Sequence, residues 1–326
     1  MRKIDFKKIL CILSCLSLTS VYAEEYIQFS GISDASAGVV IGTEETGYKF
    51  LIADDEVQEL RLFSPNGGSP EKIFPIQNQI TLPGKQKEFD LEGAARIGDT
   101  AYWITSHGRS SKGKVQLSRY IFFATEIDDA NLSVKVKGKP FLGMLDALLA
   151  SPELAPYDLK SASLLPPKQK GGLNIEGLCA SPEGWLWIGF RNPVPKGKAL
   201  LVPLKNPEKV ILGGKPDLGS PVTLDLGGLG VRDMCYTGTQ YYIIGGPQDS
   251  GTCKLYRWDG KRESHPKEVI KSFKKDFGAE IVLNLNSKGK EELFVLCDDG
   301  GKEISGVKNK KRPLKERTFR GIKIPQ

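Results

Sequence analysis

Histidine is scarce in this sequence, with two residues in 326, His107 and His265. His265 lies in "KRESHPKE", which is typical of an exposed turn, so a metal site built on several histidines is excluded. The chain also has no G-x-S-x-G elbow, no P-loop and no dinucleotide-binding glycine motif, and its cysteines beyond residue 23 show no pairs at zinc-type spacing. These absences argue against serine hydrolysis of the usual kind, nucleotide binding and a structural zinc site.

Long apolar runs are absent beyond the amino terminus. A basic start, an apolar run from Ile9 to Leu18 and the small residues Val21 and Ala23 predict a signal peptide cleaved after Ala23. A lipoprotein anchored through Cys15 would have only about half a dozen apolar residues before that cysteine, which is short. No later stretch approaches the roughly 20 apolar residues of a membrane span. We therefore expect residues 24–326 to form one exported domain, periplasmic or secreted, that does not span a membrane.

The cysteines and the charged residues beyond the signal peptide indicate less about the fold and function. The four cysteines beyond the signal peptide permit disulfides in an oxidising compartment without specifying them; they are Cys179, Cys235, Cys253 and Cys297. Residues 302–323 hold nine Lys or Arg against two Glu. Because no aromatic platform is interleaved with these charges, they favour a solvated loop before a last strand at 318–324 over nucleic-acid binding. The oligomeric state is left open.

An internal repeat organises the rest of the chain. Five segments share a plan in which an acid precedes a short apolar strand, a Gly or Asn turn and a second apolar run. They are "SGISDASAGVVIGTEETGYKFLIADDE", "FDLEGAARIGDTAYWITSHGR", "LNIEGLCASPEGWLWIGFRN", "LGVRDMCYTGTQYYIIGGPQ" and "FGAEIVLNLNSKGKEELFVLCDDGG". The acid precedes the second run by 9, 9 and 8 residues in the middle three, counted from Glu92, Glu176 and Asp233. This regularity predicts equivalent hairpins.

Further strands follow each hairpin, so every unit has three or four strands, as in a propeller blade. The sequence therefore predicts an all-β fold, a β-propeller with six blades favoured and five possible. The longest gap between units contains a short helical insertion near 141–160, where Leu142, Leu145, Leu148 and Leu149 fall at helical spacing. We expect this insertion to pack against a blade rather than cover the channel.

Three long strings carry a family resemblance: "DLEGAARIGDTAYWITSHGRSSKGK", "GGLNIEGLCASPEGWLWIGFRNPVPKGKALLVPLKNP" and "LDLGGLGVRDMCYTGTQYYIIGGP". They resemble the bacterial domain of unknown function 3616 family over most of the exported chain. The sequence is also similar, more distantly, to phytase-like propeller proteins with esterase-like activity. The resemblance implies an exported propeller-like domain and brings no established reaction.

The repeated acids are candidate metal ligands. In a propeller the starts of the innermost strands meet at one channel mouth, so Asp34 and the acids of the other units would gather there. The candidate set is Glu92, Asn174, Glu176, Asp233 and Glu280. Oxygen ligands suit Ca²⁺, which makes calcium the possible cofactor. Structural ion pairing with Arg109, Arg191 and Arg232 explains a repeated acid more simply and is favoured. The same three arginines are candidates for holding an anionic ligand.

His107 stands outside this repeat. It lies in "ITSHGRSSKG", just after a strand, where a histidine can act as general acid or base beside Arg109 and Lys112. Two acidic turns, "VLCDDGG" and "ADDE", lack the further acids of an EF-hand loop and are interpreted as turns of the repeat.

Three functions remain open. The leading hypothesis is a protein that binds a small or anionic ligand at the channel mouth, with calcium possible. The alternative is a metal-assisted phosphoester or lactone hydrolase that uses His107 and the acids. The third is a platform for protein interactions.

Overall fold

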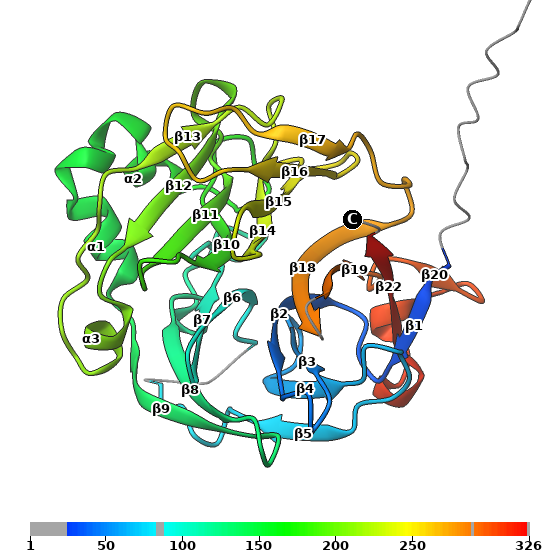
Figure 1. Cartoon of the computed structure of the whole chain (residues 1–326). Helices are drawn as coiled ribbons and strands as arrows, with labels where there is room; N and C mark the ends of the chain where they lie inside the picture. The colour runs from blue at the N-terminus through cyan, green and yellow to red at the C-terminus, as the bar shows by residue number, and fades with distance from the viewer. Residues whose placement is uncertain (1–24, 83–87, 288–289, 325–326) are drawn as a thin grey trace, which may run out of the picture.

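The computed structural model describes residues 25–82, 88–287 and 290–324. The expected signal peptide therefore lies outside the described residues. Within them, the chain forms a β-propeller of five four-stranded blades around a central channel (Figure 1). Five is the smaller of the two blade numbers that the sequence left open, and the described residues form no sixth blade.

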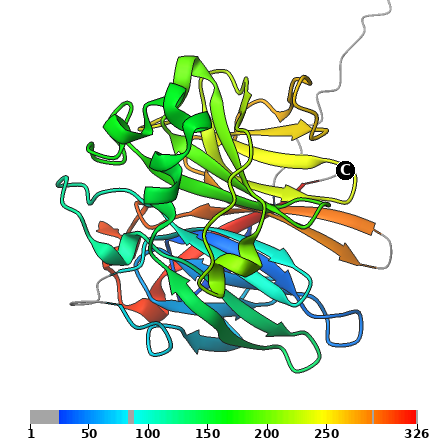
Figure 2. The ribbon, with the colours of Figure 1, turned by 90° about the vertical axis from the view of Figure 1, so that its left-hand side faces the viewer.

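Each of the first four blades is an antiparallel meander whose first strand lies innermost. Their strands are β2 Ala35–Ile41, β3 Lys49–Asp54, β4 Glu59–Phe63 and β5 Lys72–Pro75; β6 Leu91–Ile97, β7 Thr100–Thr105, β8 Phe122–Asp128 and β9 Ser133–Phe141; β10 Asn174–Ala180, β11 Leu186–Asn192, β12 Ala199–Leu204 and β13 Val222–Leu224; β14 Gly230–Tyr236, β15 Tyr241–Gly246, β16 Lys254–Trp258 and β17 Lys267–Ile270. Figure 2 shows the propeller from the side.

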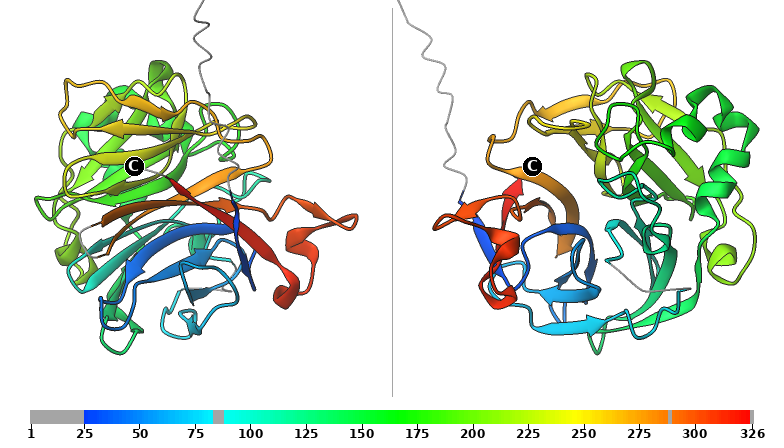
Figure 3. Two further views of the ribbon diagram at one scale, coloured as in Figure 1. Left: turned by 45° about the vertical axis from the view of Figure 1, so that its right-hand side comes forward. Right: turned by 180° about the vertical axis from the view of Figure 1, so that it is seen from behind.

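The fifth blade closes the ring with strands from both ends of the described chain. Its strands, from the channel outward, are β18 Gly278–Ser287, β19 Lys290–Asp298, β22 Thr318–Ile324 and β1 Ile27–Ser30. β1 pairs with β22 in antiparallel register, Ile27 opposite Gly321. An excursion between β19 and β22 carries the small hairpin of β20 Glu303–Ile304 and β21 Val307–Lys308 away from the blade (Figure 3).

Hydrophobic cores fill the spaces between neighbouring blades. Each strand of a blade presents alternate side chains to the blade on either side, so apolar residues on both faces are buried. Between the second and third blades, for example, Ile104 and Phe122 pack with Ile188 and Leu200. The same arrangement recurs at the other four boundaries of the ring within the described residues.

The helical insertion packs against this framework. It contains α1 Met144–Ala150, the 3₁₀ turn Pro152–Tyr157 and α2 Leu159–Ala162; farther along, α3 Pro207–Ile211 precedes β13. Met144 and Leu148 of α1 are fully buried in the core between the second and third blades. This is the blade-packing role expected from the sequence. None of the described helices is long and apolar enough to cross a membrane.

Candidate ligand site at the channel mouth

A β-bulge interrupts the first strand of every blade at the same point. In each hairpin the register shifts by one residue near the start of the inner strand. A bulge turns its extra side chain out of the normal alternation, here into the channel mouth. The five bulged residues are Ser36, Glu92, Glu176, Arg232 and Glu280, and all of them line one cavity.

The equivalent residue of the fourth blade is therefore Arg232, one position before the Asp233 that the sequence comparison aligned. Because side chains alternate along a strand, a one-residue difference reverses the direction of the side chain. Asp233 is 3% exposed, and its Oδ2 accepts a hydrogen bond from Val282 N, at 2.9 Å, in the next blade. Burial raises the pKa of Asp233 well above its usual value. Asp233 is not among the described residues that line the cavity.

The cavity has a volume of about 380 Å³ and is strongly charged. Its nine carboxylates belong to Asp34, Asp55, Glu56, Glu88, Asp90, Glu92, Glu176, Glu280 and Asp298, and its five basic side chains to Arg119, Lys168, Arg191, Arg232 and Lys310. Lys168 and Ser111 line the cavity at its solvent side, where it opens. Carboxylates thus outnumber basic groups, and the site is acidic overall.

One wall is an ion-pair network that joins three blades. Arg191 Nη1 lies 2.7 Å from Glu176 Oε1, and Arg191 Nε donates to Pro247 O in the fourth blade at 2.9 Å. Arg232 forms an ion pair with Glu280 of the fifth blade and places its Nε 3.7 Å from Glu176 Oε2 in the third. The two arginines therefore neutralise Glu176 and Glu280 and tie the blades together.

Asn174 lies beside this wall. Its Nδ2 donates to Glu176 Oε1 at 2.7 Å, while its Oδ1 has no hydrogen-bond partner among the described residues. The residue is 4% exposed and lines the cavity. A buried amide oxygen without a partner costs free energy unless something in the cavity bonds to it.

Next to this network lie carboxylates with few basic partners. Ligand atoms of Asp55, Asp90 and Glu92 lie within 4.8 Å of one another. Burial raises the pKa of Asp55 well above its usual value, and the neighbouring Asp54 and Asp34 raise it further. Burial also raises the pKa of Glu92, with Asp90 and Glu176 adding to the shift.

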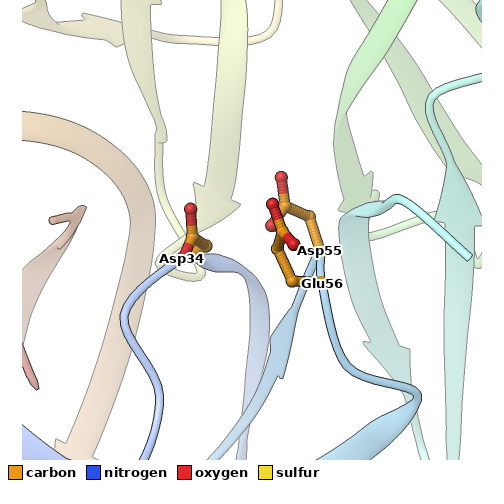
Figure 4. A group of neighbouring side chains, drawn as sticks. All are labelled: Asp34, Asp55 and Glu56. Atoms are coloured by element: carbon orange, nitrogen blue, oxygen red, sulfur yellow. The ribbon is translucent and has the colours of Figure 1, made fainter. Parts of the chain in front are cut away.

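A third acidic group lies at the rim, where Asp34 precedes β2 and Asp55 and Glu56 follow β3 (Figure 4). Lys310 Nζ approaches from the excursion between β19 and β22, 2.8 Å from Glu56 Oε1 and 3.8 Å from Asp34 Oδ1. Burial, followed by the Asp298 carboxylate, raises the pKa of Asp34 to about 7. Asp34 is therefore the carboxyl group of this rim that can exchange a proton near neutral pH.

His107 and Arg109 lie away from the described lining of the cavity. The His107 ring is fully buried, and its Nδ1 donates to Thr105 O at 2.8 Å because that oxygen can only accept. Burial lowers the pKa of His107 to about 4. Arg109 donates from Nε to Ser163 O at 2.8 Å and so holds the helical insertion.

Sequence reasoning missed several residues of the site. Asp55, Glu56 and Asp298 lie in the two acidic turns that were interpreted as repeat architecture, and both turns follow the second strand of a blade. The spacing within the hairpins could have identified Arg232 as the equivalent residue of the fourth unit. Arg232 precedes Tyr241 by nine residues, the same spacing as in the two preceding units.

The fold and the cavity together define a five-bladed β-propeller with an acidic site at one channel mouth. The chain belongs to the family described as Protein of unknown function (DUF3616), whose sequence model matches residues 128–306. No curated protein matches the chain in sequence.

Solved structures with a similar fold share little sequence with this chain. Glutaminyl cyclase from Myxococcus xanthus is 11% identical, with a TM-score of 0.49 over 92% of this chain and 94% of that one. A putative glucose dehydrogenase from Thermus thermophilus is 12% identical, with a TM-score of 0.41 over 92% and 100%. At such identities the similarity says nothing of function.

Proposed function

We propose that this protein binds a small anionic ligand in the channel-mouth cavity. The observation that carries the proposal is the convergence of polar side chains from all five blades on one solvent-open cavity. Sites of this kind hold small molecules through a few well-placed polar groups. Two basic groups that line the cavity are suited to an anion: Lys168 lies at its solvent side, and Arg119 Nε is buried without a hydrogen-bond partner among the described residues. We also propose that the protein acts outside the cytoplasm, on the strength of its amino-terminal sequence.

Charge balance sets a condition on such binding. An anion entering a cavity with nine carboxylates and five basic groups is repelled unless protons or a metal ion reduce the negative charge. A hard divalent cation such as Ca²⁺ suits these oxygen ligands. Calcium is therefore the cofactor proposed for ligand binding.

A thermal-unfolding screen tests this function. The full chain would be mixed with phosphate esters, sugar acids and lactones, each with and without calcium. Lys168→Ala removes a basic group of the cavity, whereas Lys170→Ala removes an exposed lysine of the same loop that does not line it. We expect an anionic ligand to raise the melting temperature of the wild type and Lys170→Ala more than that of Lys168→Ala. Equal shifts in all three proteins, or no shift with any compound, would refute the proposal.

Metal-assisted hydrolysis of a phosphoester or lactone is a second candidate, favoured by Asp34. This carboxyl group lines the cavity, and its pKa of about 7 matches a general acid or base at neutral pH. His107, the catalytic candidate from the sequence, is fully buried and is not among the described residues that line the cavity. Hydrolysis in the same screen that is lost in Asp34→Asn and kept in His107→Asn would support this candidate. Activity that survives in Asp34→Asn would exclude Asp34 from the chemistry.

A further inference from the structure

The acids of the cavity differ in how they are neutralised. Arg191 and Arg232 pair with Glu176 and Glu280, and Lys310 pairs with Glu56. By contrast, Asp55 Oδ1 is buried without a hydrogen-bond partner, and Glu92 forms no ion pair among the described residues. Asp55 and Glu92 are thus carboxylates of the mouth that lack a basic partner among the described residues, and a bound cation would supply the positive charge there.

Asp90 completes this group and is only partly neutralised. Its Oδ2 lies 2.7 Å from Arg119 Nη1, but that guanidinium is shared with Glu88, whose Oε1 lies 2.9 Å from Nη2. Burial raises the pKa of Asp90 above its usual value despite Arg119. One basic side chain therefore faces several carboxylates.

The three carboxylates lie close enough together for one cation to bind all of them. Their ligand atoms lie within 4.8 Å of one another. Two oxygens bound to the same Ca²⁺, each at roughly 2.4 Å, can be at most about 4.8 Å apart. The group offers oxygen ligands without histidine or cysteine, which favours Ca²⁺ over softer transition metals.

A neutral oxygen on the adjoining strand is a second, independent indication of a ligand. Asn174 is 4% exposed and lines the same cavity, and its Oδ1 has no partner among the described residues. Ser106 links its strand to the acidic group, since Ser106 N donates to Asp90 O at 3.0 Å and Ile175 N donates to Ser106 O at 2.8 Å. Amide oxygens are common calcium ligands beside carboxylates.

We propose that Asp55, Asp90 and Glu92 bind one Ca²⁺ at the channel mouth, with Asn174 Oδ1 as the neutral protein oxygen on the neighbouring wall. Calcium takes six to eight oxygens, so positions remain for water and for an oxygen of the bound anion. This inference rests on the proposed ligand-binding function and names the cation through which the anion is held. Glu176 and Glu280, which the sequence suggested, lie equally close to Glu92, but both form ion pairs with arginine, so the cation is assigned to Asp55 and Asp90 instead.

Isothermal titration of the chelator-treated full chain with CaCl₂ tests the site. We expect one Ca²⁺ per chain for the wild type and an affinity lower by more than about tenfold for Asp55→Asn and for Glu92→Gln. Asp146→Asn, an exposed aspartate of α1, is the matched control and should bind like the wild type.

Folding of the variants is checked by thermal unfolding in the presence of a chelator. Replacing Asp55 relieves repulsion between carboxylates, so the folded variant should be at least as stable as the wild type without calcium. No calcium binding by the wild type, or equal binding by Asp55→Asn, would overturn the inference. An anion that binds equally well in excess chelator would overturn the calcium site and leave the proposed function intact. Calcium binding by a protein that binds none of the anions would support the calcium site and overturn the proposed ligand-binding function.

Discussion

Arg232 of β14 forms an ion pair with Glu280 of β18, across the boundary between the fourth and fifth blades. The same guanidinium lies near Glu176 of the third blade, and both glutamates are less than a tenth exposed. Removing one partner from a buried ion pair leaves an uncompensated charge. Arg232 therefore stabilises the fold by neutralising buried glutamates of two other blades, in addition to lining the cavity.

We expect Arg232→Met to lower the free energy of unfolding by about 3–5 kcal/mol, because two buried glutamates lose a basic partner. Urea unfolding followed by tryptophan fluorescence measures this loss. Arg257→Met, at an exposed position of β16 in the same blade, should change stability little. Similar losses in the two variants would show that the network stabilises nothing.

The third and fourth blades approach each other closely at Gly230. A Cβ at this position would lie 1.9 Å from the backbone oxygen of Arg191, which cannot move without shifting β11. We expect Gly230→Ala to lower the free energy of unfolding by about 1–3 kcal/mol or more. Gly301→Ala is the control, since no atom lies within 4 Å of its added Cβ. A Gly230→Ala protein as stable as this control would show that the blades can separate freely.

Phe29 fixes the closing strand of the ring. Its ring stacks on Phe319 of β22 with centroids 4.6 Å apart and meets Phe63 of the first blade edge-on at 5.7 Å. We expect Phe29→Ala to cost about 3–5 kcal/mol in calorimetric unfolding. Leu212→Ala, which truncates a side chain that is 70% exposed, should cost far less. Equal costs would mean that ring closure does not depend on this contact.

His107 should make stability depend on pH. Its pKa is about 4 in the folded protein, against 6.5 for an ordinary histidine, so the unfolded chain binds the proton more readily. The stability that the neutral ring contributes is complete above pH 6.5 and is lost as the pH falls toward 4.

His107→Asn removes this titration and keeps a residue that tolerates the positive φ of 52° at this position. Between pH 7 and pH 4 the wild type should lose about 3 kcal/mol more than this variant. His265→Asn, outside the buried core, should follow the wild type. Parallel stability profiles for the wild type and His107→Asn would contradict the buried, neutral ring.

Much of the fold follows from sequence because strand periodicity and turns repeat locally in every unit. The five innermost strands and the helical insertion were located this way. Blade number was less certain because β1 and β22, at opposite ends of the described chain, complete one blade. No local pattern encodes that pairing.

The site was harder to predict because a β-bulge changes which residue faces the channel. The acids of the second, third and fifth units were found because their bulged residues are glutamates. In the fourth unit the bulged residue is Arg232, and the acid next to it is Asp233. Aligning the units on their acids therefore selected Asp233, whose side chain lies on the other face of the strand. Asp55 and Asp298 were interpreted as turn residues because they come from the ends of second strands, and only the closed ring brings these to the mouth.

The bulges also make the channel mouth open to redesign. A bulged side chain lies outside the alternation that packs the blades, so a change there leaves the facing apolar rows in place. Four of the five bulged residues are charged, and two of those glutamates are held by arginine. Ser36 is the uncharged member, and its hydroxyl donates a weak hydrogen bond to Ala53 O at 3.5 Å. An engineer seeking to install a new binding group in this propeller would begin at Ser36.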